Sequence, residues 1–187
     1  MNDIATEALN KIFSILAIVS ISISAIIFIT YLFSKLFSAK LSIIGNFNKL
    51  IYDNSVVFSW AIATLATFGS LFYSEVSGFI PCTFCWYERI AMYPLVLILG
   101  IGIIKKNHEI WLYAFPFSLI GLLVSIYHYQ LQMFPDQSSI SCSTDVSCSG
   151  SWILEFGFVT MPFMALSTFL LISVLLLIPN IIKKEDN

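Results

Sequence analysis

The chain has 187 residues, 58% of them hydrophobic and only 11% charged, with a mean hydropathy of +0.90 and a formal net charge of −2. So much apolar surface excludes a soluble globular domain and a disordered chain. Four cysteines and no basic stripe also exclude a disulfide-rich secreted domain and a nucleic-acid partner, so the sequence predicts an integral membrane protein.

Five apolar stretches reach or approach the length of about 20 helical residues that crosses a bilayer. The first, 12–33, is uncharged and longer than the core of a cleavable signal peptide. Residues 37–53 have apolar side chains at helical spacing, so they form either an amphipathic helix in the membrane interface or an ordinary polar linker. The other spans are 55–74, 85–104, 110–130 and 156–178. We therefore predict an all-α, polytopic membrane protein with a four-helix transmembrane bundle in 55–187 and one extra N-terminal transmembrane helix in 1–54.

The positions of lysine and arginine predict how these spans are oriented. Most of these residues follow the first, third or fifth span: Lys35, Lys40, Lys49, Lys105, Lys106, Lys183 and Lys184. Only Lys11 and Arg89 fall on the other side. Because positively charged loops stay in the cytoplasm, we expect the N-terminus outside and the C-terminus inside. The loops 75–88 and 131–156 then face outward.

All four cysteines fall in these two outward loops. Cys82 and Cys85 come just before an apolar helix, and Cys142 and Cys148 lie in the next outward loop. Both pairs return to the same face of the membrane, where disulfides can form and persist. We therefore expect two dithiols that exchange oxidising equivalents by thiolate attack. A static disulfide for the second pair, or a Cys₄ metal site made by both pairs, is the alternative interpretation.

The first pair has surroundings that favour a reactive thiolate. A helix N-terminus offers unpaired N–H groups and a partial positive charge. Arg89 lies one helical turn after Cys85, so its cation is expected to stabilise the Cys85 thiolate, the alternative being that it only snorkels to the interface. His128, near the outer end of the fourth span, is a candidate for bonding a cofactor carbonyl or relaying a proton, although such histidines are often simply interfacial.

The electrons from a thiol oxidase need an acceptor. The sequence contains no dinucleotide-binding fingerprint, P-loop or haem-attachment motif. A lipid-soluble acceptor fits the position of Cys85 and Arg89 at the edge of the bilayer. A quinone, which takes two electrons and two protons, is the expected choice.

Several motifs resemble the DsbB family of membrane disulfide-forming oxidoreductases, in particular its BdbC-type branch. They are Pro-Cys-Thr-Phe-Cys-Trp-Tyr-Glu-Arg at 81–89, Ile-Tyr-His-Tyr-Gln-Leu-Gln at 126–132, the second cysteine pair and Phe-Gly-Phe-Val-Thr-Met-Pro at 156–162. The resemblance covers about residues 55–180. It implies a multi-pass enzyme of the bacterial cytoplasmic membrane that uses ubiquinone or menaquinone. It also implies a thioredoxin-fold, DsbA-like partner on the outer side, which the enzyme reoxidises.

The resemblance further implies roles for the first pair and its neighbours. Cys85 is expected to face the quinone, and Cys82 to exchange with the second pair. Arg89 and His128 are expected to help bind the quinone.

In the second pair, Cys142 is expected to react with the partner and Cys148 to pass the disulfide to Cys82. The function that follows is a quinone-dependent protein-disulfide oxidoreductase. Two alternatives remain: the Cys₄ membrane module, and a quinone reductase of the vitamin-K-epoxide-reductase type, a family that places its Cys-x-x-Cys at the last span.

Overall fold

The computed structural model describes residues 2–37, 42–134 and 148–186. Within these residues it has five long helices: α1 (Asn2–Phe37), α2 (Ser42–Leu71), α3 (Thr83–Lys105), α4 (Trp111–Met133) and α5 (Met161–Asp186). A π-helical turn, η1 (Phe72–Val76), ends α2, and a 3₁₀ turn, η2 (His108–Ile110), precedes α4. The predicted all-α fold is confirmed.

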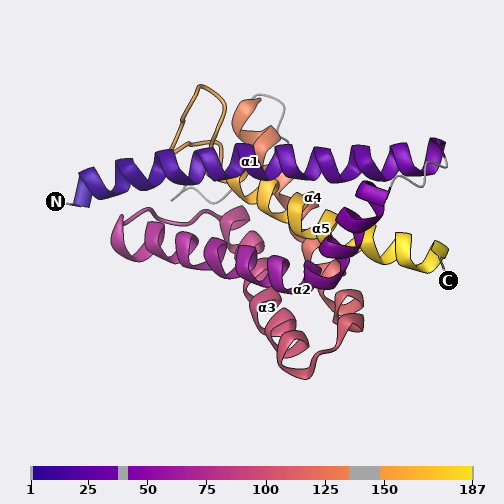
Figure 1. Cartoon of the computed structure of the whole chain (residues 1–187). Coiled ribbons are helices and arrows are strands. Elements are labelled where there is room, and N and C mark those ends of the chain that lie inside the picture. Colours follow the sequence, from indigo (N-terminus) through magenta and orange to yellow (C-terminus); the bar gives the residue numbers. More distant parts are fainter. Residues whose placement is uncertain (1, 38–41, 135–147, 187) are drawn as a thin grey trace.

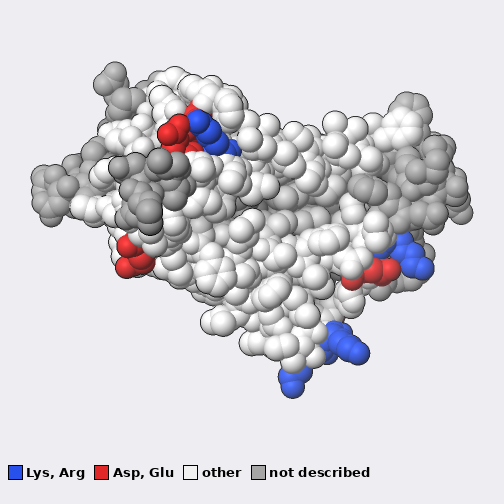
Figure 2. Space-filling model, turned by 60° about the vertical axis from the view of Figure 1, so that its left-hand side comes forward, with Lys and Arg blue, Asp and Glu red and all other residues white. Residues whose placement is uncertain are grey.

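Each long helix contains a stretch long and apolar enough to cross a membrane. These stretches are Thr6–Phe33, Lys49–Val76, Thr83–Lys105, His108–Met133 and Met161–Ile182. Large apolar side chains such as Ile104 (80% exposed) and Leu97 (70% exposed) point away from the protein. Figure 2 shows charged side chains at the extremities of the visible face, with a broad uncharged surface between them. This surface is suited to lipid rather than water.

Helix α5 occupies the centre of the molecule and packs against α1, α2 and α4. Half of its apolar span is buried, against at most 28% for each of the other four helices. In Figure 1, α1 and α5 run alongside each other, and the α3–α4 hairpin projects from them. The buried core lies where α5 meets the hairpin and α2, and its fully buried members include Leu95, Leu99, Phe169, Ile172 and Leu176.

Two boundaries differ from the sequence predictions. Of the segment 37–53, residues 42–53 are helical and continuous with the second span in α2, whereas 38–41 lie outside the described residues. The last span begins at Met161 rather than at 156, because the backbone turns back on itself between Glu155 and Val159. Phe156 and Gly157 have positive φ angles of 52° and 78°, which a right-handed helix does not allow.

The connections place both described cysteine regions at one end of the molecule. The start of α1 reaches the same end, where the hydroxyls of Thr6 and Ser77 lie 3.0 Å apart. At the other end, Tyr52 of α2 stacks on His108 of η2, with ring centroids 5.5 Å apart. The alternation of helix directions therefore brings the described segments around residues 77–82 and 148–160 to the same end of the molecule.

Candidate redox site

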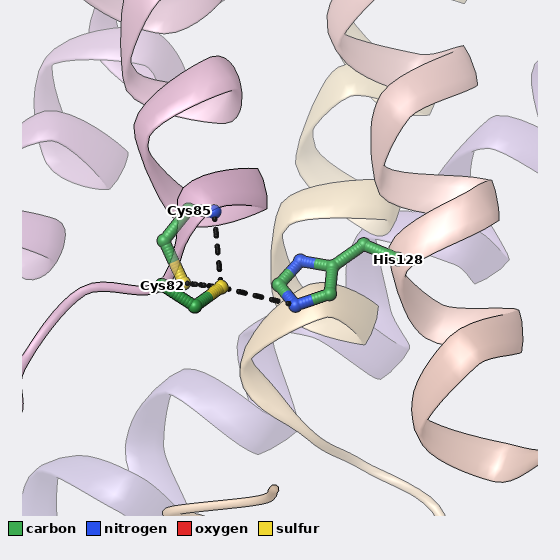
Figure 3. Close-up of side chains that lie close together, drawn as sticks. All are labelled: Cys82, Cys85 and His128. Atoms are coloured by element: carbon green, nitrogen blue, oxygen red, sulfur yellow. Dashed lines mark hydrogen bonds between the residues drawn. The ribbon is translucent and has the colours of Figure 1, made fainter. Parts of the chain in front are cut away.

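The first cysteine pair is built into the N-terminus of α3. Cys82 is the N-cap of this helix, and its Sγ accepts a hydrogen bond from the backbone N–H of Cys85 over 3.3 Å. The two sulfur atoms are 2.9 Å apart, and both cysteines are free thiols (Figure 3). A small movement of either side chain is enough to form a disulfide ring.

The electrostatic environment favours a thiolate at Cys82. The hydrogen bond from the Cys85 thiol lowers the pKa of Cys82 well below its usual range, helped by His128 and opposed by burial. The hydrogen bond from the backbone N–H of Cys85, in the first turn of α3, lowers this pKa further.

His128 connects the cysteine pair to the carboxylate of Glu88. Its side chain extends from α4 toward Cys82, and its Nε2 is 3.5 Å from the Cys82 Sγ (Figure 3). Its Nδ1 is 2.9 Å from Oε1 of Glu88, which lies on α3 one turn beyond Cys85. The imidazole is 1% exposed and the Glu88 side chain 12%. A carboxylate on Nδ1 fixes the ring so that Nε2 faces the sulfur.

Arg89 was expected to stabilise the Cys85 thiolate, and the contacts that the structure describes for it are with Ser70 and Trp86. Its guanidinium donates from Nε to the Ser70 hydroxyl and from Nη2 to the Ser70 carbonyl, both over 3.0 Å. It also lies over the Trp86 ring, 5.3 Å from the centroid. Ser70 is the penultimate residue of α2, just before the π-helical turn, so Arg89 ties α3 to the end of α2.

A cavity of about 380 Å³ opens beside this pair. Its lining is mostly apolar and includes Cys85, Glu88 and Arg89. Small-molecule sites commonly have about 300–1,000 Å³, apolar walls and a few polar groups. Cys82 and His128 are not among the residues that line the cavity. The two sulfurs therefore have different neighbours: Cys85 borders the cavity, and Cys82 contacts His128.

The second cysteine pair is described only at Cys148, since Cys142 lies outside the described residues. Cys148 is disulfide-bonded and 2% exposed. It forms a small buried cluster with Cys82 and Leu131, against which Phe84 and Cys85 pack. This cluster brings one sulfur of the second loop next to Cys82 of the first pair.

The structure adds residues that the sequence analysis did not single out. Glu88 is one of them: its side chain is only 12% exposed and contacts His128. Ser70 and Tyr73 were also passed over, although Ser70 binds Arg89 and both line the cavity. Of these three residues, only Glu88 could have been predicted from the sequence, because an acidic residue one turn inside a membrane span needs a partner.

Comparison with known proteins identifies the family. A family model described as disulfide bond formation protein DsbB matches residues 53–178. This chain belongs to the DsbB family. The match begins inside α2 and ends near the end of α5, so α1 lies outside it.

Relatives within the DsbB family support this assignment. The chain is 46% identical over 138 residues to "probable disulfide formation protein C 2" of Bacillus anthracis, which covers 98% of that protein and 74% of this one. It is 49% identical over 123 residues to "disulfide bond formation protein C" of Bacillus subtilis, covering 89% of that protein and 64% of this one. No solved structure matches. The chain is thus a DsbB-family disulfide-forming oxidoreductase with an additional helix.

Proposed function

We propose that this protein reoxidises a thioredoxin-fold thiol oxidase on the outer side of the bacterial cytoplasmic membrane. Electrons pass from the partner to Cys142 and Cys148, then to Cys82 and Cys85, and finally to a membrane quinone. The observation that carries this proposal is the position of Cys82, which contacts the second cysteine region on one side and Cys85 on the other.

Each exchange step conserves electrons. A partner thiolate attacks the Cys142–Cys148 disulfide, and its second thiol completes the transfer, leaving the partner oxidised and this pair reduced. The Cys148 thiolate then attacks Cys82 of an oxidised first pair and releases Cys85 as a thiolate. Cys142 resolves the mixed disulfide, so the second pair is oxidised again and the first pair holds two electrons.

The Cys82–His128–Glu88 contacts supply the acid–base chemistry for these steps. With Glu88 accepting a hydrogen bond from Nδ1, the imidazole Nε2 can take the thiol proton of Cys82, as in other cysteine–histidine pairs. The Cys82 thiolate then forms the S–S bond with Cys85, 2.9 Å away, as two electrons leave the pair. His128 therefore acts on the sulfur, which supports its proton-relay alternative over direct bonding to the cofactor.

The residues around the cavity fit a quinone. The lining is mostly apolar, the redox-active Cys85 borders it, and Arg89 supplies a cation there. A bound ubiquinone or menaquinone would accept the two electrons and two protons of the first pair. Arg89, held by Ser70 and Trp86, is positioned to bind a carbonyl oxygen and to favour negative charge on it.

The orientation we propose is N-terminus outside and C-terminus in the cytoplasm. Lys105 and Lys106 lie in the turn opposite the cysteine end. By the positive-inside rule that turn faces the cytoplasm, and the cysteines then face the oxidising side. The partner would dock at the cysteine end.

A thiol-trapping experiment tests the proposed function. We expect the purified protein, given a reduced thioredoxin-fold oxidase, to turn over disulfides only when quinone is added. Cys85→Ser should abolish quinone reduction and leave the protein inserted in the membrane. Stoichiometric bound zinc with unreactive thiols would contradict the proposal, since the ligand atoms of Cys82, Cys85 and His128 lie within 4.8 Å of one another.

A further inference from the structure

Helix α1 forms one wall of the cavity beside Cys85. Its lining residues are Phe13, Leu16, Ala17, Val19, Ser20 and Ile23, which recur every three or four residues along one face. The family match begins at residue 53, and the relative that is covered over 98% of its length matches only 74% of this chain. A helix outside the shared region therefore completes the cavity that the shared region opens.

We propose that α1 is part of the acceptor site and sets which lipid-soluble acceptors this enzyme takes. This inference rests on the proposed function, because it assumes that the acceptor of the first cysteine pair occupies the cavity. The helix separates the occupant from surrounding lipid and limits the width of the space in front of Cys85. Side chains on its inward face then contact the occupant directly.

The contacts of Phe13 show that α1 is fitted to this position. Its ring lies against Gly69 of α2, where a Cβ would meet the Phe13 Cζ at 3.0 Å. It also packs at a tilt against Tyr73, with centroids 5.9 Å apart. Tyr73 stacks on Phe79 and Phe79 on Trp152, with centroids 5.7 and 5.0 Å apart. All four rings line the cavity, so α1 is joined by aromatic contacts to both cysteine loops.

Two tyrosines indicate the chemistry of the occupant. Tyr73 and Tyr93 both line the cavity, and within the described part of the chain their hydroxyls have no hydrogen-bond partner. Tyr73 is only 7% exposed. A buried donor without a partner costs about 1–3 kcal/mol. An apolar molecule with carbonyl oxygens supplies the acceptors that these donors lack, which is the chemistry of a quinone.

Photolabelling tests whether α1 contacts the acceptor. The full-length protein in liposomes is illuminated with an azide-bearing ubiquinone analogue, and the labelled peptides are identified by mass spectrometry. We expect label, displaced by excess unlabelled quinone, in residues 13–23 as well as in α3 near Cys85. Absence of displaceable label from α1 overturns the inference, whether or not label is found elsewhere.

Matched phenylalanine variants provide a second test. Phe13→Ala removes a ring from the cavity wall, whereas Phe28→Ala removes one from the same helix where it is 51% exposed and outside the lining. We expect Phe13→Ala to weaken the binding of decylubiquinone, measured by quenching of tryptophan fluorescence, roughly fivefold to tenfold, and to raise its KM equally. Phe28→Ala should leave both values unchanged.

Different results would overturn the role of α1 and the proposed function. Equal affinities for the Phe13→Ala and Phe28→Ala variants overturn the role of α1, while quinone reduction by the wild-type protein keeps the proposed function intact. If the wild-type protein reduces no quinone, the proposed function fails and the inference with it. Oxidation of the Cys82–Cys85 pair by a soluble chemical oxidant, compared between variants, shows that each variant is folded at the site.

Discussion

At the scale of single residues, the two cysteines of the first pair differ by their neighbours. Cys82 caps α3 and contacts His128, and Cys85 borders the cavity. A thiolate is both the better nucleophile and the form that a helix N-terminus favours. In the proposed function, two cysteines separated by only two residues thus have different roles: Cys82 exchanges disulfides and Cys85 delivers electrons to the acceptor.

Removing the imidazole should raise the pKa of Cys82. The contacts with His128 favour the thiolate, so in His128→Ala the thiolate forms only at higher pH. We expect the midpoint of the pH dependence of Cys82 alkylation to move upward by about one unit, the equivalent of about 1.4 kcal/mol. Peptide-resolved alkylation rates measure this, with Tyr127→Phe as the control on the same helix. An unchanged midpoint in His128→Ala would refute the proposed contact.

Arg89 should matter for the acceptor and not for thiol exchange. Arg89→Gln removes a cation from the cavity lining, and hydrogen bonds to charged groups contribute about 1.5–3 kcal/mol, so we expect the KM for quinone to rise at least about tenfold. Disulfide formation in the second pair should continue. Ser70→Ala keeps the cation but loses one of its anchors. If Ser70→Ala and Arg89→Gln have equal effects, Arg89 acts only by joining α2 to α3.

At the scale of elements, the position of the α3–α4 hairpin depends on how closely α4 approaches α5. Gly121 permits this approach, because a Cβ there would lie 2.2 Å from the ring of the buried Phe169. The same hairpin carries Cys82, Glu88 and His128. Packing at Gly121, two helical turns from His128, therefore sets how closely the hairpin that carries the site lies against α5.

Gly121→Ala should destabilise the protein although alanine favours helix. Overpacking typically costs about 1–3 kcal/mol, more than the gain of about 0.5–1 kcal/mol from replacing a helical glycine. We expect a lower unfolding temperature in detergent micelles and partial recovery when Phe169→Leu is added. Gly100→Ala is the control, since its Cβ would meet only the Trp60 indole at 3.2 Å. Equal stability of the two alanine variants would contradict this packing argument.

At the scale of the whole molecule, the two ends have different charges and different chemistry. Cys82, Cys85, Cys148, Glu88 and Arg89 lie at one end, and Lys105 and Lys106 lie at the other. In a membrane this arrangement predicts that disulfide exchange takes place on the side opposite the lysines.

Site-specific labelling tests this orientation. In a background with the native cysteines replaced by serine, a membrane-impermeant maleimide should modify Ser151→Cys in intact protoplasts. It should modify Lys105→Cys only in inside-out vesicles, because the positively charged turn stays in the cytoplasm. Labelling of Lys105→Cys in intact protoplasts would place the cysteine end in the reducing compartment and exclude the proposed relay.

The sequence alone determined the five apolar helices, because hydropathy acts locally along the chain, and from the charges beside them it predicts a common side for the four cysteines. Its motifs also singled out Cys82, Cys85, Arg89 and His128 as candidate site residues. Contacts between helices were decided by the tertiary structure, since side chains distant in sequence meet only after packing. The Glu88–His128 pair, the Ser70 anchor of Arg89 and the closure of the cavity by α1 are of this kind. Nothing in the local pattern of α1 distinguishes a lipid-facing helix from one that encloses a site, because both are apolar.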